Sequence, residues 1–127
     1  MENITVGELE ATLDCSAPGE LHVRLAGKST SRDAGKALAP LFDQTLATAR
    51  GDQRAVTLHF ERLEYFNSST IAALVQFIRA AQERGVPLTV RYDAGQKWQA
   101  LSFDALKRAL RPPQGTAPMV VFAPDGG

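Results

Sequence analysis

The stretch Leu63–Ile71 reads LEYFNSSTI, and it marks a change from one apolar pattern to another. Before it, Val56, Leu58 and Phe60 alternate with polar residues, which is the period of a β-strand. After it, apolar residues recur at helical spacing. Between the two patterns lie residues 67–70, NSST, whose short side-chain oxygens can accept the free N–H groups of a first helical turn. The stretch therefore predicts a strand, a tight turn and a helix N-terminus.

A hydroxyl group in this NSST turn would lie at the positive end of a helix dipole. A phosphorylated serine is stabilised at such a position, because backbone N–H donors and the dipole both favour negative charge. Most serines and threonines that precede an apolar helix only cap it, so the residues by themselves favour a cap over a regulatory site.

The segment Thr57–Thr70, TLHFERLEYFNSST, together with the helix and strand that follow it, resembles the centre of a STAS domain. That family includes the anti-sigma factor antagonists, in which a strand leads through an Asp-Ser-Ser/Thr-Gly loop into a helix. The first hydroxyl residue of the loop is the one phosphorylated. The resemblance places Asn67 at the Asp and Ser68 at the phosphorylated position. It places Ser69 at the second hydroxyl residue and Thr70 at the Gly.

Two of these four positions depart from the commonest pattern. Asn67 cannot supply a carboxylate, and Thr70 restricts the backbone where Gly is usual. A STAS-like subgroup that regulates bacterial diguanylate cyclases has an Asn-Thr-Ser-Ser loop, which NSST resembles more closely. The resemblance therefore implies phosphorylation at Ser68, with Ser69 and Thr70 as less favoured positions.

Length and charge limit the classes of function. A chain of 127 residues makes one ordinary domain, here expected to be a single STAS-like domain over 1–127 with a frayed tail at 123–127. With 14 basic and 14 acidic residues, no overall attraction to nucleic acid or anionic membrane is expected. Cys15 is the single cysteine, and without a signal peptide the chain reads as cytoplasmic. No apolar run approaches the roughly 20 residues that direct membrane insertion needs.

The N-terminal half predicts two strands and a helix. Apolar and polar residues alternate over Leu9–Cys15 and Leu21–Leu25, and a hairpin turn is expected at 16–19. The next apolar face has helical spacing and is expected to end at Gly51. Pro40 implies either that this helix starts near it or that the segment before it is kinked.

Gly27-Lys28-Ser29 matches the end of a phosphate-binding P-loop. The full motif needs a second Gly five residues before Gly27, and that position holds His22 within a strand pattern. No nucleotide is therefore expected, and Gly27 is expected to end its strand, as is common in STAS domains.

The C-terminal half predicts a helix from about Ser69 to Arg84, then a strand at Leu88–Tyr92. A third helix is expected with one apolar face, and Met119–Phe122 is compatible with an added edge strand. The residues assigned to that third face are Trp98, Leu101, Ala105, Leu106 and Leu110. The fold class is thus α/β, a STAS-like mixed sheet of β-β-α-β-α-β-α order with helices packed mainly on one face.

Catalytic and metal chemistry find little support in the sequence. His22 and His59 lie on separate predicted strands without a partner at metal-ligand spacing, and one cysteine excludes a Cys-rich zinc site. His22 is expected to be a surface strand residue. His59 could serve as a base for Ser68, but no third triad member is identifiable. Neither a cofactor nor enzymatic activity is expected.

The predicted function is a phosphorylation-switched protein-binding module. Partner contact is expected over Tyr65–Thr70, with at least one of Tyr65 and Phe66 packed in the core instead. By resemblance, the partner is a GHKL-type serine kinase acting as an anti-sigma factor, or an analogous regulator, and a PP2C-type phosphatase reverses the reaction. Two alternatives stay open: an unphosphorylated structural subunit, such as the cytoplasmic partner of an ABC-type lipid transporter, and a small hydrolase that uses Ser68.

Overall fold

The computed structural model describes residues 2–16, 19–52, 54–93, 95–109 and 120–125. Its helices and strands follow one another along the chain as β1 (Glu2–Val6), β2 (Leu9–Asp14), β3 (Glu20–Ser29), α1 (Ala34–Asp52), β4 (Ala55–Phe66), α2 (Ser68–Arg84), β5 (Leu88–Asp93), α3 (Lys97–Ala109) and β6 (Val120–Asp125).

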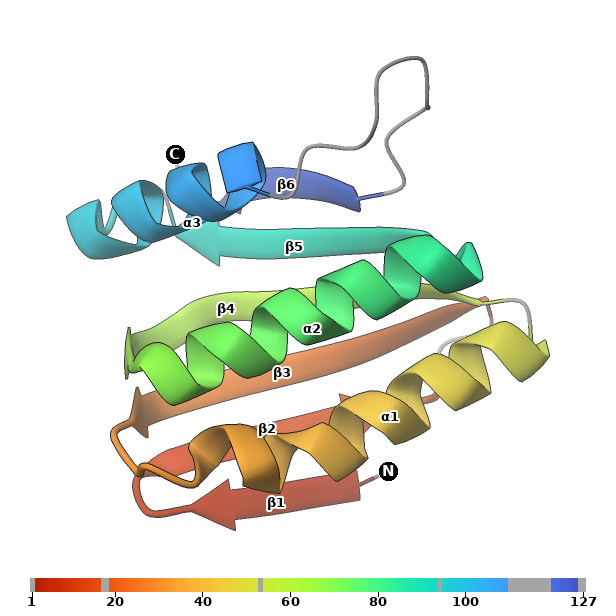
Figure 1. The fold of residues 1–127 in the computed structure, drawn as a ribbon, viewed down its shortest axis with the longest axis horizontal. Coiled ribbons are helices and arrows are strands. Elements are labelled where there is room, and N and C mark those ends of the chain that lie inside the picture. Colours follow the sequence, from red (N-terminus) through yellow and green to blue (C-terminus); the bar gives the residue numbers. More distant parts are fainter. Residues whose placement is uncertain (1, 17–18, 53, 94, 110–119, 126–127) are drawn as a thin grey trace.

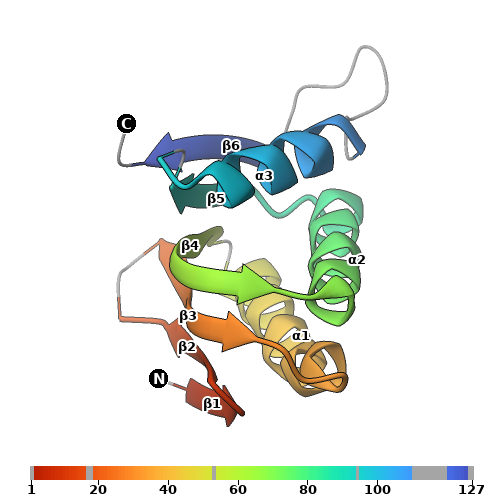
Figure 2. The same cartoon turned by 90° about the vertical axis from the view of Figure 1, so that its left-hand side faces the viewer.

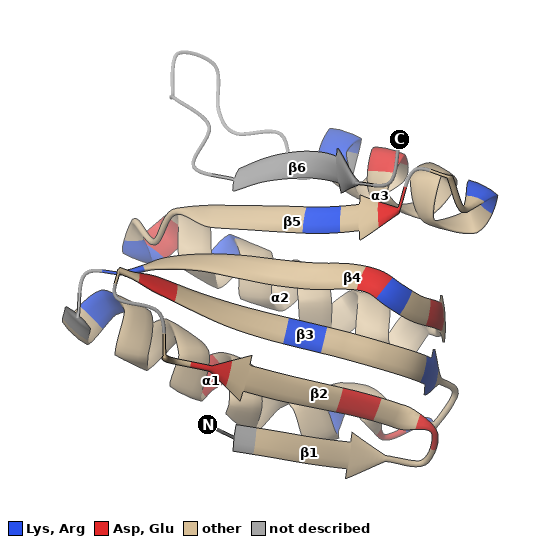
Figure 3. Cartoon of the chain, turned by 180° about the vertical axis from the view of Figure 1, so that it is seen from behind, with Lys and Arg blue, Asp and Glu red and all other residues tan. Residues whose placement is uncertain are grey.

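The six strands form one sheet in the order of the sequence (Figure 1). β1, β2 and β3 pair antiparallel, and β3 to β6 pair parallel. Each of the three parallel steps needs a crossover, and these contain α1, α2 and α3 in turn. The helices pack on one face of the sheet, and the view from behind shows the strands uncovered (Figures 2 and 3). The predicted fold class, a mixed sheet with helices on one face, is confirmed.

The core lies between the sheet and the helices. Val56, Leu58 and Phe60 of β4 are buried, while the residues that alternate with them face the other side. Leu74 and Ile78 of α2 cover this face and are themselves buried. Each such side chain contributes roughly 1.5–3 kcal/mol on burial, which is why the two apolar periods meet at this sheet.

The predicted strand, turn and second helix are confirmed. α2 begins at Ser68, one residue before the expected start, and ends at Arg84. Gly85 adopts the left-handed conformation with φ of 70°, and its N–H donates to Gln82 O at 3.3 Å. Gly is favoured at this position because it has no Cβ to oppose a positive φ.

Both ends of the sheet differ from the expectation. β1 was not predicted, because Glu2–Val6 is short and contributes only Ile4 and Val6 as apolar residues. β6 pairs with β5 through Asp125, so residues 123–125 of the expected frayed tail belong to a strand. Residues 17–18 of the hairpin turn expected at 16–19 lie outside the described residues, and so does Met119.

α1 begins at Ala34 and contains Pro40, so a start near Pro40 is wrong. Gly51 does not end the helix, which runs to Asp52. A proline inside a helix removes one backbone hydrogen bond. Here the turn before it is anchored, because Ala34 and Leu38 are fully buried against the sheet, while Pro40 itself is exposed.

The buried face of α3 is Gln99, Phe103 and Leu106. The expected face was wrong for Leu101, which is 65% exposed, and for Ala105, which is also exposed. Leu110 lies outside the described residues. The prediction failed because the buried face is centred on Gln99, a polar residue that a pattern of apolar residues cannot reveal.

Gln99 replaces hydrogen bonds that the sheet does not make. Pairing between β4 and β5 ends at His59 and Arg91. Beyond that point Gln99 Nε2 donates to Phe60 O and to Leu63 O, both at 2.8 Å. Its Oε1 accepts the N–H of Asp93 at 2.7 Å. The fully buried amide therefore satisfies three backbone groups at once.

We expect Gln99→Leu to lower the free energy of unfolding by about 3 kcal/mol or more. Each buried backbone group left without a partner costs about 1–3 kcal/mol, and this substitution leaves three. Urea denaturation measures the change. Gln44→Leu, at an exposed position of α1, is the control and should alter the free energy by less than about 0.5 kcal/mol. Equal effects of the two substitutions would contradict the assignment.

Candidate functional site

Asn67 joins the end of β4 to the start of α2 and is the N-cap of that helix, with φ of −95° and ψ of 179°. Its Oδ1 accepts hydrogen bonds from Thr70 N and Thr70 Oγ1, each at 3.1 Å. Its Nδ2 donates to Ser31 O at 2.8 Å, in the connection between β3 and α1. The side chain therefore needs an acceptor at one end and a donor at the other, which an Asn has and an ionised Asp does not.

Thr70 is buried, with 1% of its surface exposed. Its hydroxyl is hydrogen-bonded to Ser29 Oγ as well as to Asn67. β3 was expected to end at Gly27 but continues to Ser29, and this brings Ser29 to Thr70. Gly27 has φ of +88°, and a Cβ there would lie 2.0 Å from Glu8 O, so the strand can bend past the β1–β2 turn only with a glycine.

Ser69 is half-buried and connects the two covering helices. Its Oγ accepts the backbone N–H of Gly35 at 3.0 Å. A Cβ at Gly35 would lie 2.6 Å from Ser69 O, so the close approach of α1 to α2 depends on this glycine. The hydroxyl thus satisfies one free N–H at the start of α1.

Ser68 is the first residue of α2 and is exposed. Its hydroxyl makes no hydrogen bond to the described part of the chain. The first turn of α2 contains no acidic residue, so no carboxylate offsets the positive end of the helix dipole. Of the three hydroxyl groups in the NSST turn, Ser68 alone points to solvent without a structural bond.

Tyr65 and Phe66 have opposite environments. Tyr65 is 50% exposed, whereas Phe66 is 5% exposed. The ring of Phe66 packs on Trp98 at a centroid distance of 5.4 Å and on Phe103 at 5.8 Å. Core packing of one of the two aromatics is confirmed, and Trp98 likewise packs partly buried against the core.

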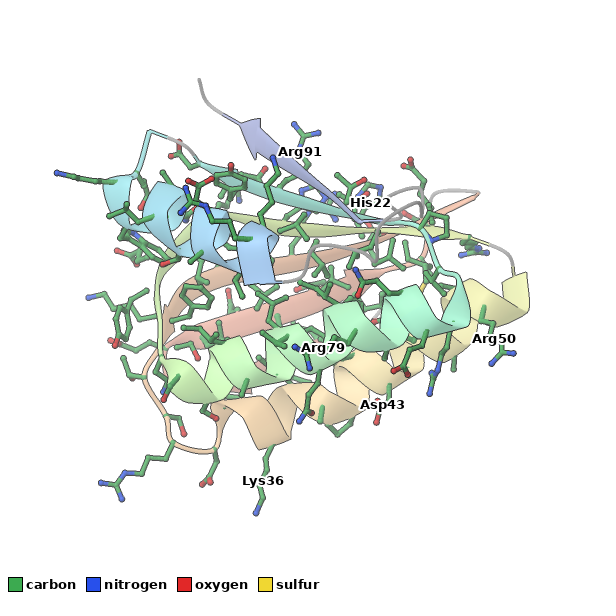
Figure 4. All side chains as sticks on the ribbon, turned by 45° about the horizontal axis from the view of Figure 1, so that its top comes forward. His22, Lys36, Asp43, Arg50, Arg79 and Arg91 are labelled. Carbon is green, nitrogen blue, oxygen red and sulfur yellow. The ribbon has the colours of Figure 1, made fainter. Side chains whose placement is uncertain are left out.

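A groove of about 480 Å³ runs between α1 and α2. Ser69 and Gly35 line it near the helix N-termini, next to Lys36, which projects into solvent (Figure 4). Most of its other lining is apolar, from Ala39, Phe42, Leu46, Ala72, Phe77 and Ala80. This groove was not predicted from the sequence. The signal for it is the run of small residues on α2, which leaves space between the helices.

The other polar candidates are not at this site. His59 alternates along β4 with the buried Leu58 and Phe60, so it lies on the face of the sheet opposite to the helices, and the base suggested for Ser68 is not at the loop. Among the residues that the structure describes, no three His, Cys, Asp or Glu side chains are grouped to hold a metal ion. No described helix is long and apolar enough to cross a membrane.

Neither a protein-family model nor a curated protein matches the sequence. Solved structures do match. A chain in the complex of the diguanylate cyclase SiaD with its activator SiaC from Pseudomonas aeruginosa gives a TM-score of 0.68 at 18% identity, over 98% of this chain and 99% of that one. The fold is STAS-like.

Two anti-sigma factor antagonists share the fold. Phosphorylated SpoIIAA of Bacillus gives a TM-score of 0.59 at 15% identity, over 91% of this chain and 92% of that one. An antagonist from Mycobacterium paratuberculosis gives 0.62 at 12% identity, over 85% of this chain and 88% of that one. At these identities the likeness is one of fold, and a shared fold does not fix a shared function.

We expect Asn67→Asp to destabilise the protein by about 1–3 kcal/mol, although Asp is as good an N-cap as Asn. The carboxylate keeps the bonds to Thr70 but loses the donor to Ser31 O and places a negative oxygen beside that carbonyl. Urea denaturation at neutral pH measures the change. Asn3→Asp, at an exposed position of β1, is the matched control and should have an effect below about 0.5 kcal/mol. A neutral Asn67→Asp would mean that the Ser31 bond contributes nothing.

Proposed function

We propose that this chain is a phosphorylation-switched protein-binding module and that Ser68 is the residue modified. The observation that carries the proposal is the difference between the three hydroxyl groups of the NSST turn. Ser69 and Thr70 hold neighbouring segments through their hydroxyls, whereas the Ser68 hydroxyl is exposed and unbonded. A kinase can reach Ser68 without breaking a hydrogen bond of the fold.

Phosphate at Ser68 adds a charge of about −1.5 to −2 at neutral pH. The start of α2 can accept this charge, because its dipole is positive there and no acidic residue lies in its first turn. The fold is therefore expected to persist after modification. What changes is the surface around the loop, from neutral to strongly negative.

The unmodified partner surface extends from the loop into the groove. Tyr65 offers a half-exposed ring, and the groove between α1 and α2 offers apolar side chains beside Ser69. A partner that covers this area removes water from Ser68. Phosphate then has to be desolvated, or is repelled by acidic groups of the partner, and the complex dissociates.

The partner in this proposal is a regulatory protein rather than a substrate. The fold is shared with anti-sigma factor antagonists and with a chain from the SiaD–SiaC complex, which supports a regulator. A GHKL-type serine kinase, acting as an anti-sigma factor or an analogous regulator, would add the phosphate, and a PP2C-type phosphatase would remove it. The chain would act as one STAS-like domain in the cytoplasm, without catalysis of its own.

The first test is intact-mass spectrometry with site localisation on protein purified from its native cells, with and without a serine phosphatase. A phosphatase-sensitive phosphate on Ser68 supports the switch. Phosphate on Ser69 or Thr70 would overturn the choice of residue, because both hydroxyls would then have to leave their bonds. No phosphate under any growth condition would favour the constitutive structural subunit.

We expect Ser68→Asp to weaken partner binding at least about tenfold, which corresponds to about 1.4 kcal/mol, and Ser68→Ala to bind constitutively. Isothermal titration calorimetry with the partner captured by the wild-type protein measures both. Ala47→Asp adds the same charge at an exposed position of α1 and is the control. Equal loss of binding in Ala47→Asp and Ser68→Asp would show that total charge, not the loop, decides binding.

A further inference from the structure

Two histidines meet on the face of the sheet that carries no helix. His22 of β3 and His59 of β4 lie on neighbouring parallel strands, and their ring nitrogens Nδ1 and Nε2 are 2.9 Å apart. The rings are stacked with centroids 5.1 Å apart. Figure 4 shows His22 on the side of the sheet away from Lys36 and Asp43 of α1. His22 is a partly exposed strand residue, as expected, but its contact with His59 was not predicted.

The outer nitrogen of each ring faces a carboxylate. His22 Nε2 is 3.2 Å from Glu20 Oε2, and His59 Nδ1 is 3.5 Å from Glu61 Oε1. Glu61 Oε1 is buried and has no hydrogen-bond partner of good geometry in the described part of the chain. The four side chains thus form a line, Glu20–His22–His59–Glu61, which we call the histidine row.

The central contact of the histidine row needs one proton. Two ring lone pairs that face each other repel, and so do two N–H groups, so one ring donates and the other accepts. The contact between His59 and Glu61 needs a second proton, because a carboxylate only accepts. Two neutral rings supply both protons.

The surroundings of His59 disfavour a positive charge on its ring. Burial lowers the pKa of His59 below its usual value, and although Glu61 raises it, Arg24 and His22 lower it further. His59 is therefore the ring that stays neutral. Its Nδ1 faces the carboxylate of Glu61, so we place its proton there, and its Nε2 then accepts from Nδ1 of His22.

We propose that the histidine row is a proton-controlled clasp between β3 and β4. It is closed while His59 is neutral and one proton lies between the two rings. It opens when both rings are protonated, because two N–H groups and two positive charges then face each other across the central contact. The clasp joins side chains of the two strands whose far ends, Ser29 and Phe66, flank the loop.

Charged groups from the neighbouring strands share this face. They are Glu10 and Asp14 on β2, Arg24 on β3, Arg62 on β4, and Arg91 and Asp93 on β5. Glu10, Arg24 and Arg62 line a hollow of about 400 Å³ next to His59 and Glu61. Asp14 is held ionised by hydrogen bonds from Ser16, which lower its pKa. The acids moderate the charge of the open clasp, while Arg24 opposes the second proton.

The direction of the pH effect follows from the lowered pKa of His59. An unfolded chain protonates this histidine near its ordinary pKa of about 6.5, before the folded chain does. Stability from His59 is therefore fully present above that pH and is lost as the pH falls, until the folded protein also takes up the proton. Acidification weakens the fold through the clasp, independently of any phosphate at Ser68.

The test is ¹⁵N nuclear magnetic resonance of the histidine rings of the full chain, from about pH 8 to about pH 4.5, which spans the ordinary histidine range. At neutral pH, His59 should be the neutral Nδ1–H form. Its protonation should occur below the ordinary pKa and should shift the His22 ring at the same pH. A neutral His59 with its proton on Nε2, or two independent titrations, would overturn the clasp.

His22→Phe keeps a ring in the stack but removes both nitrogens. We expect it to raise the pKa of His59, because His22 lowers that pKa and the central hydrogen bond to the neutral ring is lost. Glu10→Gln removes a charge from the same hollow without touching the histidine row, and should change the pKa of His59 less. An unchanged His59 in His22→Phe refutes the proposal, and if this variant does not fold, the wild-type tautomer measurement decides.

Discussion

The candidate site depends on the amide of Asn67, which acts as an acceptor toward Thr70 and as a donor toward Ser31 O. These two contacts tie the turn after β4 to the turn after β3. Because both turns come at the same edge of a parallel sheet, one side chain fixes where α1 and α2 begin relative to each other. A carboxylate at this position would cap the helix but could not make the second connection.

The hydroxyl groups of Thr70 and Ser69 make two further connections around the turn. Thr70 pairs with Ser29 beneath the loop, and Ser69 holds Gly35 beside it. Each of these bonds satisfies a polar group that is removed from water, so neither hydroxyl is free for another use. Ser68 is left as the exposed member of the turn. Three residues of the turn are held by side-chain hydrogen bonds, and Ser68 is not. The charge of Ser68 can therefore change while the fold stays the same.

The sequence was sufficient for the fold class, because the alternation before the NSST turn and the helical spacing after it are strong local signals. It was insufficient where a polar residue takes a structural role. Gln99 is buried and centres α3, and no periodicity of apolar residues indicates that. The meeting of His22 and His59 was missed for another reason, since it depends on strand register across 37 residues. The modification of Ser68 remains a prediction.

Gln99 also has a consequence for how this chain can vary. The end of β4 extends beyond its pairing with β5, and the amide of Gln99 holds this overhang at Phe60 O and Leu63 O. The backbone carbonyls that Gln99 holds leave no pattern in the sequence of β4. The end of the strand before the loop therefore depends on a residue of α3, about 30 positions further along the chain, that makes no hydrogen bond to Ser68. In related chains, loss of a glutamine at this position should accompany a shorter overhang or a longer β4–β5 ladder, and the loop would then sit at a different height above the sheet.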